Sequence, residues 1–413
     1  MTGLSDAERA AGARLMARLD AFTAFTEEPG RLTRPFLSES HRRAAAAFIG
    51  WCAEAGLAAR IDAAGNVTAR YEGKRAGAPA LLVGSHIDTV RDAGRYDGNY
   101  GALAALALVE DLAGRGERLD HAVEIVAFGD EEGVRWRTTL TGSRALAGDY
   151  PEDALDERDA AGIAMRDALV AFGGDPDAAM RMRADHVAAF VEVHIEQGPV
   201  LEAEGLPIGV VSAINGATRL EVGVDGAAGH AGATPMNLRR DAYTAAAEMT
   251  LMIERRARSE PELVATVGRM SVWPGATNVI PGHAQFSVDL RAPLDARREA
   301  ALFDIRAGIE AISRERNVAT TFAKTHEANA FTCDPRIVAG FSRAVASLGL
   351  PVRALPSGAG HDTMAIGRLR PAGMLFVRCK GGISHNPLEA ISVEDCAYGL
   401  AALGRFARNF RAG

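Results

Sequence analysis

The sequence predicts an α/β protein with a mainly parallel sheet, helices on both of its faces and a smaller inserted α+β domain. Apolar, strand-like runs alternate with helical stretches in the first half of the chain, a rhythm typical of parallel sheets. Residues 213–330 have a different order of predicted helices and strands, and the alternation of helix and strand returns from residue 331. A chain of 413 residues also exceeds what one simple core usually holds, so two domains are expected.

Three segments carry the prediction of the parallel sheet. Residues 79–90 (PALLVGSHIDTV) run from an apolar strand into a loop, and residues 101–116 form a helix that stops at glycine. Residues 121–133 (HAVEIVAFGDEEG) form the next strand. Functional groups gather at the carboxyl ends of parallel strands. We therefore expect the S-H-I-D and D-E-E-G stretches to converge on one edge of the sheet.

The inserted segment has the element order βαββαβ. This order predicts a ferredoxin-like domain, in which a four-stranded sheet is backed by two helices. The elements are expected at residues 218–229, 239–259, 262–275, 283–293, 294–317 and 318–327. The predicted domains are therefore a discontinuous one, residues 1–212 and 331–413, and an inserted one, residues 213–330.

Composition excludes several classes of partner. The net charge of −7 gives no sign of nucleic-acid binding or of a polybasic membrane anchor. No run approaches the ~20 apolar residues of a membrane-spanning helix, and the N-terminus lacks the pattern of a signal peptide. The four cysteines are scattered without a C-x-x-C pair, which favours thiols in a reducing cytoplasm. A cytoplasmic location is expected.

Histidines and acids mark several predicted strand ends. His86 and Asp88 alternate on a strand, so their side chains point to the same face. The aspartate could hold the histidine ring in the tautomer that binds metal, or the two could be only a polar pair. Asp97 lies in a glycine-rich turn before a helix, where an aspartate alone usually serves the turn. Its position near the other motifs makes it a candidate ligand.

Three consecutive acids, Asp130, Glu131 and Glu132, end the strand at residues 121–133 although like charges repel. His194 follows in a later strand, and His385 lies in a loop near the C-terminus. Three histidines with several carboxylates suit a borderline divalent metal. With Asp97 bridging, two ions could share a water of lowered pKa. One glutamate would then bind metal while its neighbour acts as the base; an exposed acidic turn is the alternative.

Eight motifs together give a family resemblance. They are GSHIDTV, DGNYGA, EEG, HIEQGPVLE, GHAGATPM, NVIPG, SGAGHD and GISHNPLE, and they extend from about residue 30 to the end. In this order they resemble the M20 metallopeptidase-like amidohydrolases. The nearest resemblance is to the hydantoinase/carbamoylase branch, which contains allantoate amidohydrolase, N-carbamoyl-L-amino acid hydrolase and β-ureidopropionase.

The resemblance implies two divalent metal ions per subunit, Zn²⁺ or Mn²⁺, with Co²⁺ or Ni²⁺ also compatible. His86, Asp97 and His194 would hold one ion. Asp97, Glu132 and His385 would hold the other, so that Asp97 bridges the pair. These ligands come from five of the motifs quoted above.

The resemblance also implies the remaining site residues. Glu131 would be the general base and acid, Asp88 would orient His86, and His230 would stabilise the oxyanion from the partner subunit. The substrate carboxylate would be held by Asn278 and Arg291, since a guanidinium forks onto both carboxylate oxygens. The ureido end would be lined by Gln197, Gly360 and His361.

The implied reaction is cleavage of the ureido C–N bond of a small carboxylate substrate, with release of ammonia and CO2. Allantoate is the best guess; N-carbamoyl-L-amino acids or N-carbamoyl-β-alanine are the alternatives. A homodimer through the inserted domain is implied as well. Other readings are a di-metal peptidase and a non-catalytic carboxylate-binding protein. Val134 and Trp136 depart from the family's usual residues after E-E-G, which leaves the wall of the substrate pocket open.

Overall fold

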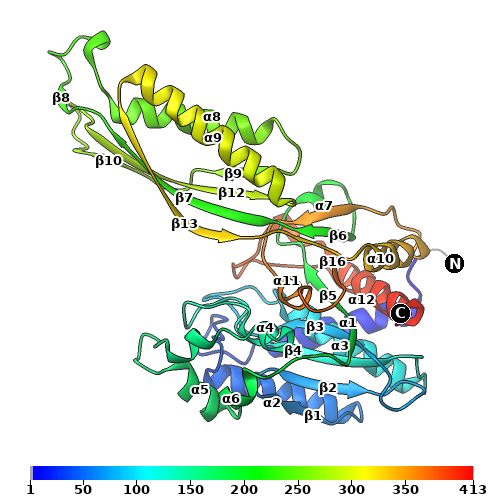
Figure 1. The fold of residues 1–413 in the computed structure, drawn as a ribbon. Coiled ribbons are helices and arrows are strands. Elements are labelled where there is room, and N and C mark those ends of the chain that lie inside the picture. The colour runs from blue at the N-terminus through cyan, green and yellow to red at the C-terminus, as the bar shows by residue number, and fades with distance from the viewer. Residues whose placement is uncertain (1–2, 413) are drawn as a thin grey trace. The chain divides into compact units, whose positions relative to one another are not determined.

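The structure, a computed structural model, describes residues 3–412 and divides into two compact units (Figure 1). The larger unit comprises Met1–Ser212, Cys333–Leu355 and Ala359–Gly413. The smaller unit comprises Ala213–Thr332 and Pro356–Gly358. Within residues 3–412 the elements are twelve α-helices and sixteen strands, so the mixed α/β class is confirmed.

A nine-stranded sheet with the strand order β1-β2-β4-β3-β5-β16-β6-β14 runs through the larger unit, and β15 (Ala354–Ser357) also pairs with β6. Its four central strands are parallel, namely β4 (Ala122–Phe128), β3 (Ala80–His86), β5 (Val187–Ile195) and β16 (Ala372–Val377). The outer pairings whose register is resolved are antiparallel, made by β1 (Ala59–Ile61), β2 (Val67–Tyr71), β6 (Ile208–Ile214) and β14 (Phe331–Thr332). All seven residues of β3 are buried, as expected for a strand covered on both faces.

Helices cover both faces of this sheet. Val191 and Val193 of β5 belong to the main apolar core, together with residues of α3 (Asn99–Gly114) and α12 (Val393–Asn409). Glu192, which lies between them and so points to the other face, accepts hydrogen bonds from Thr363 at the start of α11 (Asp362–Ile366). The remaining helices of this unit are α1 (Asp6–Phe22), α2 (Glu39–Glu54), α4 (Thr141–Ala147), α5 (Met165–Phe172), α6 (Pro176–Ala179), α7 (Val200–Ala203) and α10 (Pro335–Ser347).

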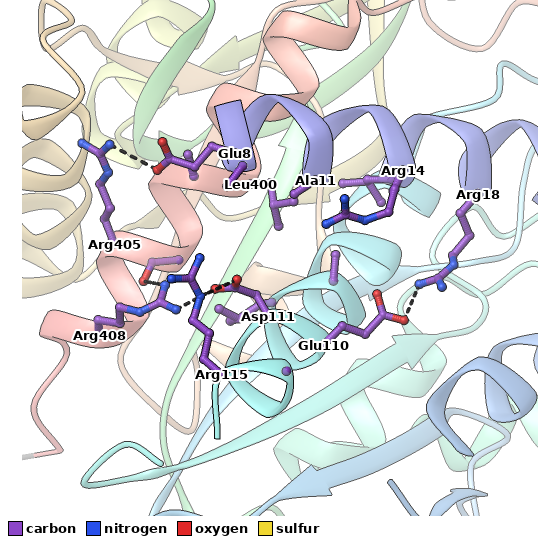
Figure 2. Close-up of a pocket in the computed structure, with 17 residues that line it drawn as sticks. Glu8, Ala11, Arg14, Arg18, Glu110, Asp111, Arg115, Leu400, Arg405 and Arg408 are labelled. Atoms are coloured by element: carbon purple, nitrogen blue, oxygen red, sulfur yellow. Dashed lines mark hydrogen bonds and ion pairs between the residues drawn. The ribbon is translucent and has the colours of Figure 1, made fainter. Parts of the chain in front are cut away.

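The first helix, α1, packs against α12 and α3. A hollow of about 460 Å³ opens between these three helices, and ion pairs cross it (Figure 2). Arg18 on α1 pairs with Glu110 on α3 at 2.8 Å, and Arg405 on α12 pairs with Glu8 on α1 at 3.2 Å. At its tightest point the packing depends on Gly12, because a side chain there would overlap the backbone of α12.

The smaller unit is an antiparallel sheet with two long helices. The strand order is β10-β12-β7-β13, with the short β9 also paired to β12. The strands are β7 (Gly216–Asp225), β9 (Val264–Thr266), β10 (Met270–Trp273), β12 (His283–Ala292) and β13 (Ala319–Ala328), and the helices are α8 (Ala242–Arg258) and α9 (Asp295–Arg316). Apolar residues of the sheet and of both helices form a separate core. A two-stranded ribbon, β8 (Gly229–His230) with β11 (Val279–Ile280), completes this unit.

Two further observations bear on the sequence predictions. All four cysteines are buried free thiols. In the described part of the chain, no helix combines the length and the apolar character that crossing a membrane requires.

We expect Gly12→Ala to lower the thermal midpoint of unfolding. A Cβ on Gly12 would lie 2.4 Å from the Cβ of Ala397 and 2.7 Å from its Cα, so helix α1 would have to move. Overpacking of this kind costs about 1–3 kcal/mol, which outweighs the ~1 kcal/mol that alanine gains over glycine in a helix. The matched control is Gly50→Ala on α2, where no atom lies within 4 Å of the new Cβ. Calorimetry should show an unchanged or higher midpoint for the control; an unchanged Gly12→Ala midpoint would contradict the packing argument.

Candidate metal centre

The predicted ligands lie where strands of the larger unit end. His86 is the last residue of β3, His194 is the next-to-last residue of β5, and Glu132 follows β4. Asp97 precedes α3, and His385 lies in the loop before α12. Chain segments far apart in sequence thus meet at one edge of the sheet, as parallel strands dictate.

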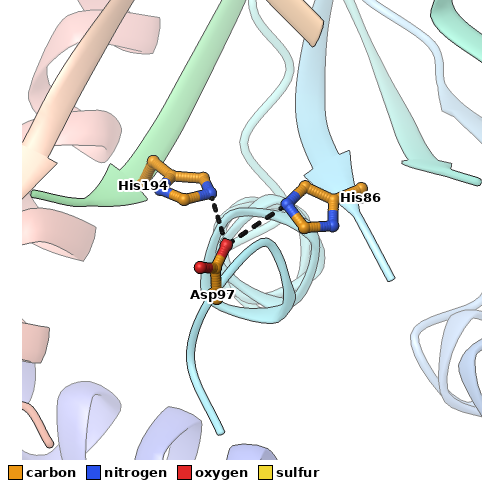
Figure 3. Close-up of side chains that lie close together, drawn as sticks. All are labelled: His86, Asp97 and His194. Atoms are coloured by element: carbon orange, nitrogen blue, oxygen red, sulfur yellow. Dashed lines mark ion pairs between the residues drawn. The ribbon is translucent and has the colours of Figure 1, made fainter. Parts of the chain in front are cut away.

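Asp97 stands between His86 and His194 (Figure 3). Its Oδ1 lies 3.4 Å from Nε2 of His86 and 3.2 Å from Nε2 of His194. The side chains of all three residues are at most 5% exposed. Ligand atoms of the three lie within 4.8 Å of one another, close enough to bind one ion together.

The other oxygen of Asp97 faces a second set of candidate ligands. Oδ2 lies 3.3 Å from Nε2 of His385, and the same nitrogen lies 3.6 Å from Oε2 of Glu132. Oε1 of Glu132 is buried and accepts no hydrogen bond from the described residues. A buried carboxylate oxygen without a donor suits a cation. Each oxygen of Asp97 therefore serves one set, the arrangement a bridging carboxylate needs.

The two buried histidines are oriented to bind metal through Nε2. Nδ1 of His86 lies 3.0 Å from the main-chain carbonyl of Asp88, and Nδ1 of His194 lies 2.9 Å from that of Ile195. A carbonyl oxygen only accepts hydrogen bonds, so each Nδ1 carries the proton. Each Nε2 faces Asp97 and, once it gives up its own proton, offers a lone pair to an ion.

Asp88 supports the site differently from the role implied for its carboxylate. The group nearest Nδ1 of His86 is the carbonyl of Asp88, while the nearest carboxylate oxygen is 3.7 Å away. The carboxylate instead accepts main-chain N–H groups of Glu131 and Glu132, both at 3.2 Å. Asp88 therefore joins the strand end that carries His86 to the loop that carries the two glutamates.

The three acids after β4 have different environments. Asp130 is fully buried, and its Oδ2 accepts the hydroxyl proton of Thr141 at the start of α4. Burial and the charge of Asp88 hold the pKa of Asp130 well above its usual range. Glu131 and Glu132 instead share a candidate ion-binding group with His86. Asp130 thus serves packing, and its two neighbours face the centre.

Electrostatic coupling is strong in this cluster. Burial alone would raise the pKa of Asp97, but hydrogen bonds from the three histidines hold it well below its usual range. The bond to Asp97 raises the pKa of His385 to about 9. Burial and Asp97 raise the pKa of Glu132 to about 7, and burial and Glu132 hold the pKa of Glu131 well above its usual range. Cations would take over the charge balance that protons supply here.

Backbone conformation at the centre is unusual. Gly98 has φ +64°, and a Cβ on it would lie 2.4 Å from the ring of His86, so no other residue fits after Asp97. Three non-glycine residues of the site also have positive φ: Asp130 (+65°), Gln197 (+56°) and His385 (+54°). Such conformations cost free energy and persist where surrounding contacts enforce them.

The residues expected at the ureido end lie beside this cluster. Nε2 of Gln197 donates to Oδ2 of Asp97 at 2.7 Å, whereas its buried Oε1 has no hydrogen-bond donor among the described residues. His361 is 1% exposed, and its ring centroid lies 4.5 Å from that of His194. Burial holds the pKa of His361 well below its usual range, so its ring is neutral. Gly360 immediately precedes it.

In the smaller unit, the ribbon brings His230 and Asn278 together. His230 is paired with Val279, the residue after Asn278, and the N–H of Ala231 donates to the carbonyl of Asn278 at 3.0 Å. The Nδ1 atom of His230 accepts the N–H groups of Gly232 and Ala233, which fixes the ring. His230 and Asn278 therefore form one local pair on an exposed loop.

Arg291 does not join that pair. Its Nε and Nη2 fork onto Asp289 at 2.8 and 3.0 Å, and its Nη1 donates to the carbonyl of Gly358 at 2.7 Å. The ribbon adjoins the end of β12 that begins at His283, eight residues from Arg291. At about 3.3 Å per residue, this places Arg291 roughly 26 Å along the strand. One chain does not bring Asn278 and Arg291 to the same carboxylate.

Trp136 belongs to the core of the larger unit. It is 3% exposed, its indole N–H donates to the carbonyl of Ile163, and its ring lies edge-on to Phe36 at 6.3 Å. The departure from the family's usual residues at this position is therefore accommodated by packing.

Two residues beside the centre were missed by the sequence prediction. Arg34 is fully buried and donates to the carbonyl of Ile87 and to Oδ1 of Asn99, both at 2.6 Å. It thereby joins the end of β3 to the start of α3. Glu389 is 3% exposed and accepts the N–H groups of Tyr96 and Asp97. The signal for Glu389 was present in the H-N-P-L-E motif, but nothing in the sequence pointed to Arg34.

The parallel sheet and its cluster of histidines and carboxylates define the class of hydrolases that hold divalent metals at strand ends. The sequence profile of peptidase family M20/M25/M40 matches residues 82–409, and the chain belongs to this family. The members of this family bind divalent metals, which the candidate ligand groups fit.

Relatives in sequence and structure agree with this assignment. The chain is 41% identical to an allantoate deiminase of Arabidopsis thaliana, over 94% of this chain and 80% of that protein. It is 42% identical to an N-carbamoyl-L-amino acid amidohydrolase of Geobacillus stearothermophilus, over 95% of this chain and 97% of that protein. A solved hydantoinase/carbamoylase family amidase from Burkholderia multivorans superposes with a TM-score of 0.91 at 33% identity, covering 96% of this chain and 97% of that one.

We expect Zn²⁺ or Mn²⁺ to raise the thermal midpoint of the metal-free protein, by an amount that grows between pH 6 and pH 9. The raised pKa of His385, about 9, stabilises the metal-free fold below pH 6.5, and that contribution is lost as pH rises through 9. Metal binding requires the same ring to be neutral, so protons compete with metal below pH 9. Thermal scans with and without chelator measure both effects. A midpoint that chelation leaves unchanged would contradict the electrostatic account.

Proposed function

We propose that this chain is a metal-dependent amidohydrolase that cleaves the ureido C–N bond of a small carboxylate substrate, releasing ammonia and CO2. The proposal rests on the position of Asp97, one of whose carboxylate oxygens faces each of the two ligand sets. Glu131 lies beside these ligands. The relatives named for allantoate and for N-carbamoyl-L-amino acids support the substrate class. Allantoate is our first choice.

The proposed centre holds two divalent ions, Zn²⁺ or Mn²⁺, with Co²⁺ or Ni²⁺ also compatible. One ion is held by His86, Asp97 and His194, and the other by Asp97, Glu132 and His385. When bound, the ions polarise the ureido carbonyl and lower the pKa of the attacking water. The Nε2 atoms that face Asp97 and the unsatisfied Oε1 of Glu132 support this assignment.

The chemistry of the protein's own groups follows from their positions. Glu131 accepts a proton from the attacking water while the water oxygen bonds to the ureido carbon. Glu131 then gives that proton to the leaving nitrogen as the C–N bond breaks. The released carbamate decomposes to ammonia and CO2. The raised pKa of Glu131 favours a group that can hold the proton between the two steps. Gln197 offers its unsatisfied Oε1 to a ureido N–H, next to His361 and the backbone of Gly360.

The smaller unit is proposed as a ferredoxin-like lid and dimerisation domain, residues 213–330. The order β13-β7-β12-β10, flanked by α8 and α9, supports this assignment. Arg291 is proposed to hold the substrate carboxylate, since its guanidinium forks onto a carboxylate here, that of Asp289. His230, which steadies the oxyanion, and Asn278 are supplied together by the partner subunit, because they form one pair about 26 Å from Arg291 along β12.

The experiment that tests the function is an ammonia-release assay on allantoate, N-carbamoyl-L-amino acids and N-carbamoyl-β-alanine, each with Mn²⁺ and with Zn²⁺. A dipeptide panel runs in parallel. Ammonia release from a ureido carboxylate supports the proposal, and the preferred substrate decides between allantoate and the alternatives. Cleavage of dipeptides without ammonia release would establish a di-metal peptidase instead. Absence of turnover from a protein loaded with metal would favour a carboxylate-binding protein.

Glu131→Gln and Glu132→Gln separate the two neighbouring glutamates. We expect Glu131→Gln to lower kcat by about 10²–10⁴-fold, the usual contribution of a general base, while both ions are retained. Glu132→Gln should lose one ion, because an amide is a weaker ligand than a carboxylate. Elemental analysis after gel filtration measures metal content beside the kinetic assay. If Glu131→Gln loses an ion and Glu132→Gln keeps both, then Glu131 is the metal ligand and Glu132 is the general base.

A further inference from the structure

We infer that Glu389 and Ser384 are positioning residues that clamp His385 against Asp97 and so set the affinity of the second metal site. The inference rests on the two-ion centre proposed above. It concerns residues that belong to neither ligand set: Glu389 is absent from every group of side chains that could hold an ion among the described residues.

His385 is the one predicted ligand whose position burial does not fix. Its side chain is 49% exposed, whereas those of His86, Asp97, Glu132 and His194 are at most 6% exposed. Its φ of +54° is strained for a residue with a Cβ. Contacts on its own loop must therefore hold this ring in place.

Ser384, the neighbouring residue, supplies the first such contact. Its Oγ lies 2.6 Å from Oδ2 of Asp97 and 2.8 Å from Oε2 of Glu389. Oδ2 is also the atom of Asp97 that faces Nε2 of His385 at 3.3 Å. The hydroxyl of Ser384 therefore links the loop of His385 to Oδ2 of Asp97, the carboxylate oxygen that belongs to the second ligand set.

Glu389 supplies the second contact, from the other end of the same loop. Its Oε1 accepts the N–H of Tyr96 at 2.7 Å and of Asp97 at 3.2 Å. Its N–H donates to the carbonyl of Asn386 at 3.0 Å, which closes the turn that directly follows His385. One buried carboxylate therefore fixes the main chain of the bridging aspartate and the hydroxyl next to the exposed histidine.

Space for this carboxylate is provided by Gly94. A Cβ on Gly94 would lie 2.1 Å from Cδ of Glu389 and 2.3 Å from its Oε1. Gly94→Ala would therefore displace the carboxylate while leaving every polar group of the clamp and every predicted ligand in the sequence. This gives a variant that tests position rather than charge.

The test is a titration of the metal-free full-length protein with Zn²⁺ in competition with a chromophoric chelator. The variants are Glu389→Gln, Ser384→Ala and Gly94→Ala. We expect each to weaken the second ion by about 10–100-fold, the usual cost of removing a group that orients a ligand, with a smaller loss at the first ion. The control is Glu202→Gln, because Glu202 accepts the N–H of Gly381 at 2.7 Å and so holds the same segment without touching Asp97. Its two affinities should match the wild type.

Thermal scans of the metal-free variants separate positioning from simple loop stability. A lower metal-free midpoint with unchanged Zn²⁺ affinity would overturn the inference, as would equal weakening of both ions. A wild type that binds only one ion refutes the two-ion centre instead. In that case the positioning role of Glu389 and Ser384 is supported if the three variants bind the single ion more weakly than Glu202→Gln does. Equal affinities would contradict it.

Discussion

The shared carboxylate of Asp97 is the interaction on which the site depends. Three histidines converge on its two oxygens, and their hydrogen bonds hold its pKa well below the usual range despite complete burial. A buried charge of this kind persists only when it is fully compensated. The strand ends, the turn at Gly98 and the loop of His385 are the parts of the fold that supply the compensation.

Around Asp97, successive layers of contacts fix the geometry. Carbonyl groups hold the buried histidine rings, and Asp88 holds the loop of the two glutamates. Arg34 joins β3 to α3 behind them, with its guanidinium 4.4 Å from the ring of Phe22. The centre is therefore built on the rigid central strands, and only the segment of His385 lies on the exposed side.

The parts of this arrangement that sequence could predict are those set by local pattern. His86, Asp97, Glu132 and His194 lie beside apolar runs whose parallel pairing brings their ends together. The antiparallel outer strands were not visible in that alternation, because β1 and β2 are short and β6 lies at the edge of the inserted segment. The separation of Asn278 from Arg291 depends on the register of β12 and β7, which no motif records. Glu389 depends on the space beside Gly94, a contact across almost 300 residues of chain.

The left-handed backbone at Asp130, Gln197 and His385 has a consequence for how such a protein changes under selection. Left-handed conformations cost residues with a Cβ roughly 1–2 kcal/mol each, and all three occur within the segments that form the centre. Substitutions that relax these turns would add to the stability of the fold while loosening the groups that meet at Asp97. Selection for heat resistance alone would therefore tend to erode the site first, and a thermostable descendant would have to gain its stability elsewhere, in helix packing or surface charge.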